Sequence, residues 1–188
     1  MIIFTFCVDI NRFSQFDLSR VANIFVNSIS KSSTNVQKLV IYTNFNLIID
    51  NLPSYVELRN YSPINPDIHI EDPWLNLNLN RLEYYKLLMN EFSQSPIWLD
   101  LDTIICRNID HLDNYPNFFV QIGTNDTTIM NILEDDDKFQ VVRNQYLQGN
   151  IFKLDYQILD AAQSYLEKYR ESIVYADMGA FNIVYHHM

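Results

Sequence analysis

The chain has 188 residues, of which 48% are hydrophobic and 14% aromatic; this composition excludes a disordered chain and suits one compact domain with its own core. The formal net charge of −10 argues against nucleic acid as the main partner, because a phosphate backbone requires a basic binding face. The 3 glycines cannot form a P-loop or a GxGxxG turn, so a phosphate must be held by a metal ion, a basic side chain or a helix N-terminus.

The apolar runs and cysteines are those expected of a cytoplasmic protein without a transmembrane segment. The opening run, Met1 to Val8, is short and lacks the basic flank of a secretory signal. No apolar run approaches the length that spans a membrane. Cys7 and Cys106 both lie in apolar runs, where we expect buried, reduced thiols, and no CxxC or HxxxH cluster suggests zinc.

The first 60 residues alternate between predicted strands and a helix. Continuous apolar and β-branched runs predict buried strands at Met1 to Val8 and Lys38 to Thr43, and a third at Tyr55 to Leu58. Between the first two, apolar residues at helical spacing (Leu18, Val21, Ala22, Phe25 and Ile29) predict a helix that Ser14 or Asp17 can cap. This β-α-β order indicates a parallel sheet covered by helices.

The rest of the chain continues the α/β pattern. Residues 60–75 contain three prolines and predict a long irregular loop, which often belongs to a binding site. A helix is expected from about Asn76 to Phe92, and Ser95-Pro96 ends it. Further strands are expected at 97–102, 117–122, 150–154 and 181–185, and a helix at 155–169. The predicted fold is a single α/β/α sandwich over residues 1–188 with a mostly parallel central sheet.

The segment from Pro96 to Cys106 carries the most information about function. Its apolar run leads into Asp100 and Asp102, which on a regular strand would point to the same face about 7 Å apart. Two such carboxylates repel each other unless a divalent cation lies between them. The carboxyl ends of the strands are also the ligand-binding edge of an α/β sheet. The alternative is a simple turn rich in aspartate.

Three stretches in this region together resemble a known family. Residues 81–88 (RLEYYKLL), 97–105 (IWLDLDTII) and 109–112 (IDHL) resemble the central block of glycosyltransferases with the A-type fold. The likeness is to families that carry the sugar-binding DxD region, including enzymes that decorate capsules and glycans. It covers residues 81–112 well, and the first strand and the last forty or so residues more loosely. It implies a hexosyl or deoxyhexosyl transfer from a nucleotide-sugar donor, UDP preferred, to a glycan or glycoprotein acceptor.

The resemblance also implies a metal site. In such enzymes the DxD carboxylates, here Asp100 and Asp102, hold Mn²⁺ or Mg²⁺ on the donor diphosphate, where the metal neutralises the leaving group. A histidine near the C-terminus often adds a third ligand, which here is His186 or His187. Adjacent residues after a strand point to opposite faces, so we expect only one of the two to reach the site. A surface histidine with no metal role is the alternative.

Donor binding is implied for residues in three parts of the chain. They are Thr5, Cys7, Val8, Asp9 and Arg12 after the first strand, Arg81, Lys86 and Leu101 around the DxD segment, and Gln148, Gly149 and Asn150 in a polar loop. Asp9 either accepts from the base or ribose or caps a helix. Lys86 falls in the apolar stripe of its helix, so it either extends to the edge or points into a polar pocket.

The C-terminal part supplies the catalytic candidate. Asp177, in the segment 175–182 (YADMGAFN), resembles a family element beside the reacting centre, so it is either a general base for the acceptor hydroxyl or a sugar-orienting carboxylate. A turn aspartate is the alternative. The acidic run 134–137 is interpreted as a solvated loop. Trp98 is expected in the core, whereas Trp74 lies in the predicted loop and is a candidate for stacking on an acceptor sugar.

The chain also departs from the family. It is short, so we expect either a minimal acceptor-binding part or a catalytic domain cut from a longer polypeptide. The usual Gly-Gly before the DxD strand is replaced by Ser93-Gln-Ser-Pro96. Two other functions remain open: a phosphatase of the haloacid-dehalogenase type, which also uses Asp-x-Asp after a strand, and a non-catalytic carbohydrate- or nucleotide-binding module.

Overall fold

The computed structural model describes residues 1–11, 13–64, 73–121 and 147–168. Its elements in chain order are β1 (Ile2–Cys7), α1 (Gln15–Ser32), β2 (Lys38–Thr43), β3 (Val56–Asn60), α2 (Pro73–Phe92), β4 (Ile97–Leu99), the 3₁₀ helix η1 (Asp110–Asn114), β5 (Phe118–Gln121), β6 (Leu147–Lys153) and α4 (Tyr156–Lys168). Within these ranges every strand and helix expected from the pattern is present. The strand expected at 181–185 lies outside the described residues.

The strands form one six-stranded sheet in the order β3-β2-β1-β4-β6-β5. β3, β2, β1 and β4 pair in parallel, while β6 pairs antiparallel with both β4 and β5. β6 is therefore the one described strand that runs against the others. The predicted α/β fold with a mostly parallel central sheet is confirmed.

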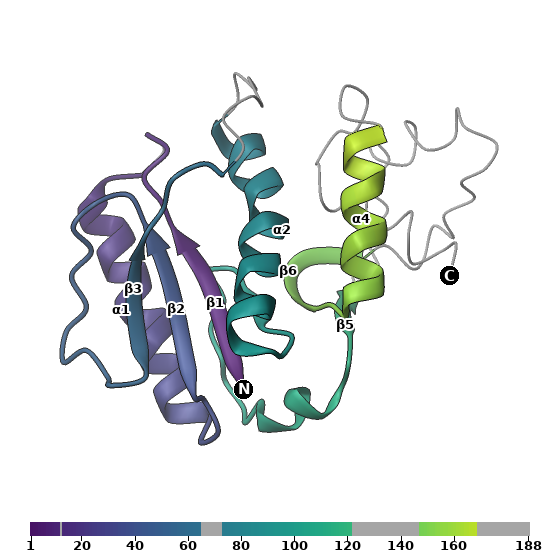
Figure 1. Ribbon diagram of the computed structural model, residues 1–188. Coiled ribbons are helices and arrows are strands. Elements are labelled where there is room, and N and C mark those ends of the chain that lie inside the picture. Colours follow the sequence, from purple (N-terminus) through teal and green to yellow (C-terminus); the bar gives the residue numbers. More distant parts are fainter. Residues whose placement is uncertain (12, 65–72, 122–146, 169–188) are drawn as a thin grey trace.

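Helices cover both faces of the sheet, as Figure 1 shows for α1 and α2 on opposite sides of the parallel strands. All six residues of β1 are buried, which a continuous apolar run predicts for a central parallel strand. Because successive side chains alternate between faces, Phe4 and Phe6 pack with α2 and α4, whereas Ile3 and Cys7 pack with α1. The result is a sandwich of three layers.

The ends of the helices have identifiable causes. Ser14 is the N-cap of α1: its Oγ accepts from the Asp17 backbone N at 3.1 Å and donates to Asp17 Oδ2 at 2.6 Å. α2 begins at Pro73, a residue favoured in a first turn, so the helix starts three residues before the expected Asn76 and includes Trp74. It ends at Phe92 because Ser93 takes a left-handed φ of 53°, before Ser95-Pro96 is reached.

No helix in the described ranges is long and apolar enough to cross a bilayer.

Candidate active site

The two aspartates of the DxD segment lie in a turn just beyond β4. The strand ends at Leu99, although Asp100 N still donates to the Asn150 carbonyl of β6 at 2.8 Å. Thr103 N then donates to the Asp100 carbonyl at 3.0 Å and closes the turn. The expectation that the strand extends to Asp102 is therefore wrong, and the spacing of a regular strand does not apply to the two carboxylates. Both nevertheless line one cavity.

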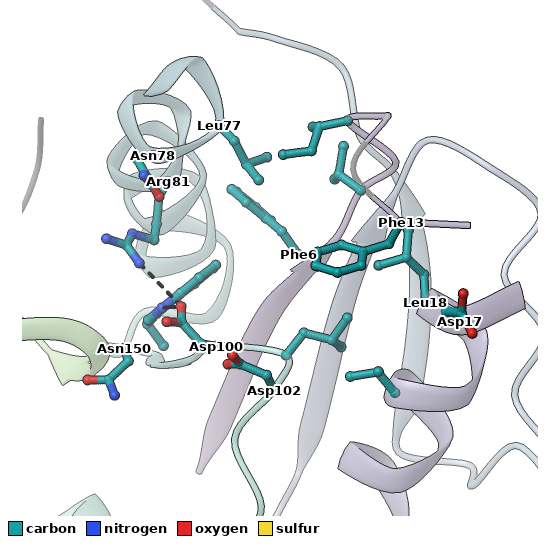
Figure 2. A pocket seen from close by; sticks show the side chains of 15 residues that line it. Phe6, Phe13, Asp17, Leu18, Leu77, Asn78, Arg81, Asp100, Asp102 and Asn150 are labelled. Atoms are coloured by element: carbon teal, nitrogen blue, oxygen red, sulfur yellow. Dashed lines mark hydrogen bonds and ion pairs between the residues drawn. The ribbon is translucent and has the colours of Figure 1, made fainter. Parts of the chain in front are cut away.

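The cavity lies over the carboxyl ends of β1 and β4, between α1 and α2 (Figure 2). Its volume is about 480 Å³, within the range typical of small-molecule sites. Six polar residues line it: Asp17, Asn78, Arg81, Asp100, Asp102 and Asn150. The apolar lining consists of Phe6, Val8, Ile10, Phe13, Leu18, Val21, Leu77, Trp98 and Leu101. In Figure 2, Arg81, Asp100 and Asn150 gather at one end, and Phe13, Leu18 and Asp17 lie at the other.

Asp100 is held by two donors. Trp98 Nε1 donates to Asp100 Oδ1 at 2.7 Å, and Arg81 Nη1 lies 3.4 Å from the same oxygen. The pKa of Asp100 is raised, mainly because the carboxyl group is buried. The positive charge of Arg81 and the hydrogen bond from Trp98 lower this pKa in part, and the nearby Asp102 carboxylate raises it. The Oδ2 atom accepts no hydrogen bond from the described residues, so it remains available to a further partner.

Arg81 is fixed from several directions. Its side chain is only 5% exposed, and its guanidinium carbon lies 4.8 Å from the centroid of the Trp98 ring and 5.3 Å from that of Phe152. Stacking on aromatic faces suits a planar guanidinium better than an ammonium group. The arrangement places a positive charge at the end of the cavity that carries the two aspartates.

Asp102 and Leu101 complete the turn. Asp102 is exposed and forms no hydrogen bond or ion pair within the described part of the chain. In the described ranges no group of three or more His, Cys, Asp or Glu residues could hold a metal ion. Two carboxylates on their own still fit Mg²⁺ or Mn²⁺, because such ions often take one or two protein carboxylates and complete their shell with substrate phosphates and water.

The residues expected after the first strand divide between the two sides of the sheet. Val8 lines the cavity, as does Phe6, whereas Thr5 and Cys7 do not and are both 0% exposed. The alternation of a strand explains this, since Thr5 and Cys7 point to the α1 side. Burial raises the pKa of Cys7 to about 12, and the Thr5 hydroxyl has no hydrogen-bond partner among the described residues. The side chains of these two residues therefore do not reach this cavity, and their role in donor binding stays a prediction.

Asp9 shapes the loop beside the cavity and is not part of the lining. Its carboxylate accepts from Asn11 N at 2.9 Å and from Gln15 Nε2 at 3.0 Å, and these hydrogen bonds lower its pKa. Its backbone is joined to the Asn44 amide by two further bonds of 2.8 and 3.0 Å. Of the two roles left open for Asp9, the structure favours the local one, which holds the loop that leads into α1.

Lys86 is also absent from the cavity. Its Nζ lies 3.3 Å from Asp160 Oδ1 and 3.1 Å from Gln163 Oε1, so it joins α2 to α4. Five residues along a helix correspond to a rotation of roughly 140° from Arg81, which turns Lys86 away from the site. Of the two positions left open for Lys86, the structure shows its extension to the edge of the helix, away from this cavity, and its role in donor binding stays a prediction.

The predicted polar loop 148–150 is part of β6. Asn150 lines the cavity, and its Oδ1 is buried without a hydrogen-bond partner in the described structure. Gln148 and Gly149 lie in the same strand, and the side chain of Gln148 is not described. Arg12, Asp177, His186, His187 and the acidic run 134–137 lie outside the described residues, so their predicted roles stay predictions.

The cavity includes residues that the sequence analysis did not predict, and one cysteine differs from its predicted burial. Asn78 lines the cavity one turn before Arg81, and their spacing of three residues on a predicted helix was a usable signal. Trp98 is 4% exposed and in the core, as expected, yet it also lines the cavity. Cys106, expected to be buried, is exposed because it follows the turn instead of continuing a strand.

Comparisons with known proteins show a shared fold without a close sequence relative. No protein-family model and no curated protein matches the chain. Among solved structures, the crystal structure of an active-site mutant of LgtC, a glycosyltransferase, matches with a TM-score of 0.59 and 12% sequence identity. The match covers 97% of this chain and 69% of that one. At this identity the likeness shows the fold, a glycosyltransferase A-type α/β arrangement.

Proposed function

We propose that the chain is a metal-dependent glycosyltransferase that moves a sugar from a nucleoside diphosphate sugar, UDP preferred, to a hydroxyl of a glycan or glycoprotein. One observation carries the proposal: Asp100, Asp102 and Arg81 meet at one end of a cavity of about 480 Å³ at the carboxyl edge of the sheet. Ligands of α/β sheets bind at this edge. The fold that the chain shares with LgtC supports the same reading.

The chemistry of the lining matches the parts of such a donor. Asp100 and Asp102 would hold Mn²⁺ or Mg²⁺, which when bound supplies Lewis-acid stabilisation of the leaving diphosphate. Arg81 adds a permanent positive charge at the same end, since a guanidinium does not lose its proton in proteins. The apolar stretch formed by Val8, Phe13 and Leu18 offers an apolar surface for a nucleoside base.

Roles for residues outside the described ranges belong to the same proposal. Asp177 is proposed as the general base or sugar-orienting carboxylate, and His186 or His187 as a further metal ligand. Arg12 is proposed to contact the donor, as are Gln148 and Gly149.

Titration calorimetry with Mn²⁺ and a panel of UDP-, GDP- and TDP-sugars tests the proposal. We expect at least one of them to bind only when Mn²⁺ or Mg²⁺ is present. Asp102→Ala should lower this affinity by about 100-fold or more, since even outer-shell partners of a metal site cost about 10- to 100-fold. The matched control is Asp50→Ala, which removes an exposed carboxylate outside the cavity.

Each possible outcome has a distinct meaning. If no nucleotide sugar binds or is hydrolysed with any divalent metal, the proposal fails. If Asp102→Ala binds the Mn²⁺–donor complex as tightly as the wild type, the metal assignment is wrong. Hydrolysis of an aryl phosphate that is lost in Asp100→Asn would indicate the phosphatase, and donor binding without turnover over a range of acceptors would indicate a binding module.

A further inference from the structure

We infer that the donor carries a neutral, hydroxyl-rich sugar and that Asn78 is the side chain that hydrogen-bonds its hydroxyls. This inference rests on the proposed function, because it concerns the sugar part of the same donor. It adds what the fold and the DxD segment leave open, namely the chemical class of the sugar.

The first argument is the charge of the cavity. The described lining contains three carboxylates, those of Asp17, Asp100 and Asp102, against one guanidinium, that of Arg81. A divalent cation would offset the excess, but the donor diphosphate brings its own negative charge. A sugar carboxylate, as in a uronic acid, would then add an anion to a site where Arg81 is already paired with Asp100. An anion in a partly buried site without a counter-charge is costly.

The second argument is the position of Asn78. It lies on α2, three residues before Arg81, so both side chains reach the cavity from the same face of the helix. Figure 2 shows Asn78 and Arg81 projecting from the same part of α2, on the side of Asp100 and Asn150 and across the cavity from Asp17. In a nucleoside diphosphate sugar the diphosphate lies between the ribose and the sugar. If the nucleoside occupies the apolar end with Phe13 and Leu18, the group next to Asn78 is the sugar.

The third argument is hydrogen bonding. Asn78 is half-buried, and its amide forms no hydrogen bond with the residues that the structure describes. A primary amide offers two donors and one acceptor, and a hydroxyl both donates and accepts, so the two groups satisfy each other. Asn150 lines the same end, and its Oδ1, which has no partner among the described residues, needs a donor. A carboxylate oxygen cannot donate to it, whereas a hydroxyl can.

The test compares the affinities of Mn²⁺ complexes by calorimetry. The ligands are UDP, UDP-glucose, UDP-galactose and UDP-glucuronate, with GDP, GDP-mannose and GDP-mannuronate as a second series if guanine nucleotides bind better. The affinity gained from the sugar, called the gain below, is the dissociation constant of the nucleoside diphosphate divided by that of its sugar conjugate. We expect a neutral hexose to bind about tenfold or more tightly than the uronate, because an unpaired polar group in a buried site lowers affinity.

Variants of Asn78 assign the effect to this side chain. Asn78→Ala should reduce the gain of the neutral sugar to near one and leave the affinity for Mn²⁺–UDP unchanged. Asn78→Ser, which keeps a hydroxyl, should restore part of the gain. Asn90→Ala is the matched control, because Asn90 is exposed on the same helix and lies outside the cavity; it should leave every affinity as in the wild type. Circular dichroism checks that each variant is folded.

Several results would overturn the inference. One is a uronate donor that binds as tightly as the neutral sugars, and another is a gain that survives in Asn78→Ala. A higher acceptor KM in Asn78→Ala with an unchanged donor gain would place Asn78 at the acceptor instead. The failure of every nucleoside diphosphate to bind, in wild type and variants alike, would overturn the proposed function itself and is therefore distinguishable.

Discussion

Arg81 owes its fixed position to aromatic rings as much as to its ion pair. The Nη1 to Oδ1 distance of 3.4 Å from Asp100 is long for a charge-assisted hydrogen bond, whereas Trp98 and Phe152 both lie within cation–π range. Trp98 also donates to Asp100, so one ring orients both members of the pair. Arg81, Trp98 and Asp100 therefore act as a unit that presents one carboxylate and one guanidinium to the cavity.

This unit predicts that lysine cannot replace Arg81. Arg81→Lys keeps the charge but loses the planar stack, so we expect the free energy of unfolding to fall by about 2 kcal/mol, the scale of a desolvated cation–π contact. We also expect weaker binding of the Mn²⁺–UDP complex. Urea denaturation and calorimetry measure the two effects.

The control for Arg81→Lys comes from the other basic residue of α2. Lys86→Met breaks an ion pair with Asp160 whose side chains are 43% and 63% exposed, so it should cost less than about 1 kcal/mol and leave nucleotide binding unchanged. Equal losses in the two variants would show that the aromatic stack contributes nothing beyond charge.

At the scale of elements, the segment that follows the DxD turn is fastened along α1. Ile105 N donates to Ser28 Oγ at 3.1 Å, and Ser32 Oγ donates to the Ile105 carbonyl at 2.8 Å. Further on, the Asp110 carboxylate at the start of η1 accepts from the Ser33 hydroxyl and from Thr34 Oγ1 at 2.7 Å, beyond the end of α1. These bonds hold the chain on the far side of the turn and so help to keep Asp102 in place.

The Asp110 contacts predict an acid-dependent loss of stability. Hydrogen bonds from Ser33, Thr34 and Asn108 lower the pKa of Asp110 below its ordinary value of 3.8. A carboxylate with a lowered folded pKa contributes stability above its unfolded pKa and loses it as the pH falls through the folded value. Asp110→Asn should therefore unfold at lower urea concentration than the wild type at pH 7, and the difference should shrink as the pH falls below 3.8.

Urea midpoints measured over a series of pH values test this. Asp50→Asn, which removes an exposed carboxylate without these hydrogen bonds, should show no such convergence with the wild type. A gap between wild type and Asp110→Asn that stays constant down to pH 2 would contradict the role assigned to Asp110.

The elements were predictable from sequence to within a few residues because their signals are local. The continuous apolar runs of β1 and β2 reflect burial on both faces of a strand, and the helical spacing of apolar residues in α1 reflects burial on one face. The structure confirms these three elements. The end of β4 was missed because it depends on where β6 stops pairing, which is a contact between residues about fifty positions apart. The local preference of each residue for strand or helix does not depend on such a distant contact, so it could not predict where β4 ends.

The site was predictable only in part, for a related reason. Of the residues predicted to bind the donor or the metal, six line the cavity: Asp100, Asp102, Leu101, Arg81, Val8 and Asn150. Thr5, Cys7, Asp9 and Lys86 do not. The strand and helix residues outside the cavity lie on another face of their element: β1 turns Thr5 and Cys7 toward α1, and α2 turns Lys86 toward α4. A motif identifies the segment near a site, but the period of the strand or helix decides which of its side chains arrive there.

At the scale of the whole molecule, the cavity depends on the junction between two parts of the sheet. Arg81, Trp98 and Asp100 come from α2 and the end of the parallel strands, whereas Asn150 and Phe152 come from β6, which runs the other way. The Trp98 and Phe152 rings stack across the junction with centroids 6.2 Å apart. The geometry of the site is therefore only as stable as the pairing of β4 with β6.

Tyr85 joins the two parts of the sheet. Its side chain is fully buried in α2, and its hydroxyl donates to the Pro96 carbonyl at 2.6 Å, just before β4. The same hydroxyl accepts from Leu154 N at 2.7 Å, just after β6. One hydroxyl thus satisfies buried backbone groups on both sides of the junction.

Removal of this hydroxyl should weaken the junction more than the loss of one hydrogen bond suggests. Tyr85→Phe leaves the Pro96 carbonyl and the Leu154 N–H buried and unpaired, so the free energy of unfolding should fall by about 1–3 kcal/mol. Tyr156→Phe is the matched control: Tyr156 is 49% exposed and donates to Asn90 Oδ1 at 2.9 Å, so its loss should cost about 0.5 kcal/mol or less. Urea denaturation gives both values, and amide hydrogen exchange should show faster exchange at Leu154 in Tyr85→Phe. If the two variants unfold at the same urea concentration, the hydroxyl of Tyr85 does not hold the two parts of the sheet together.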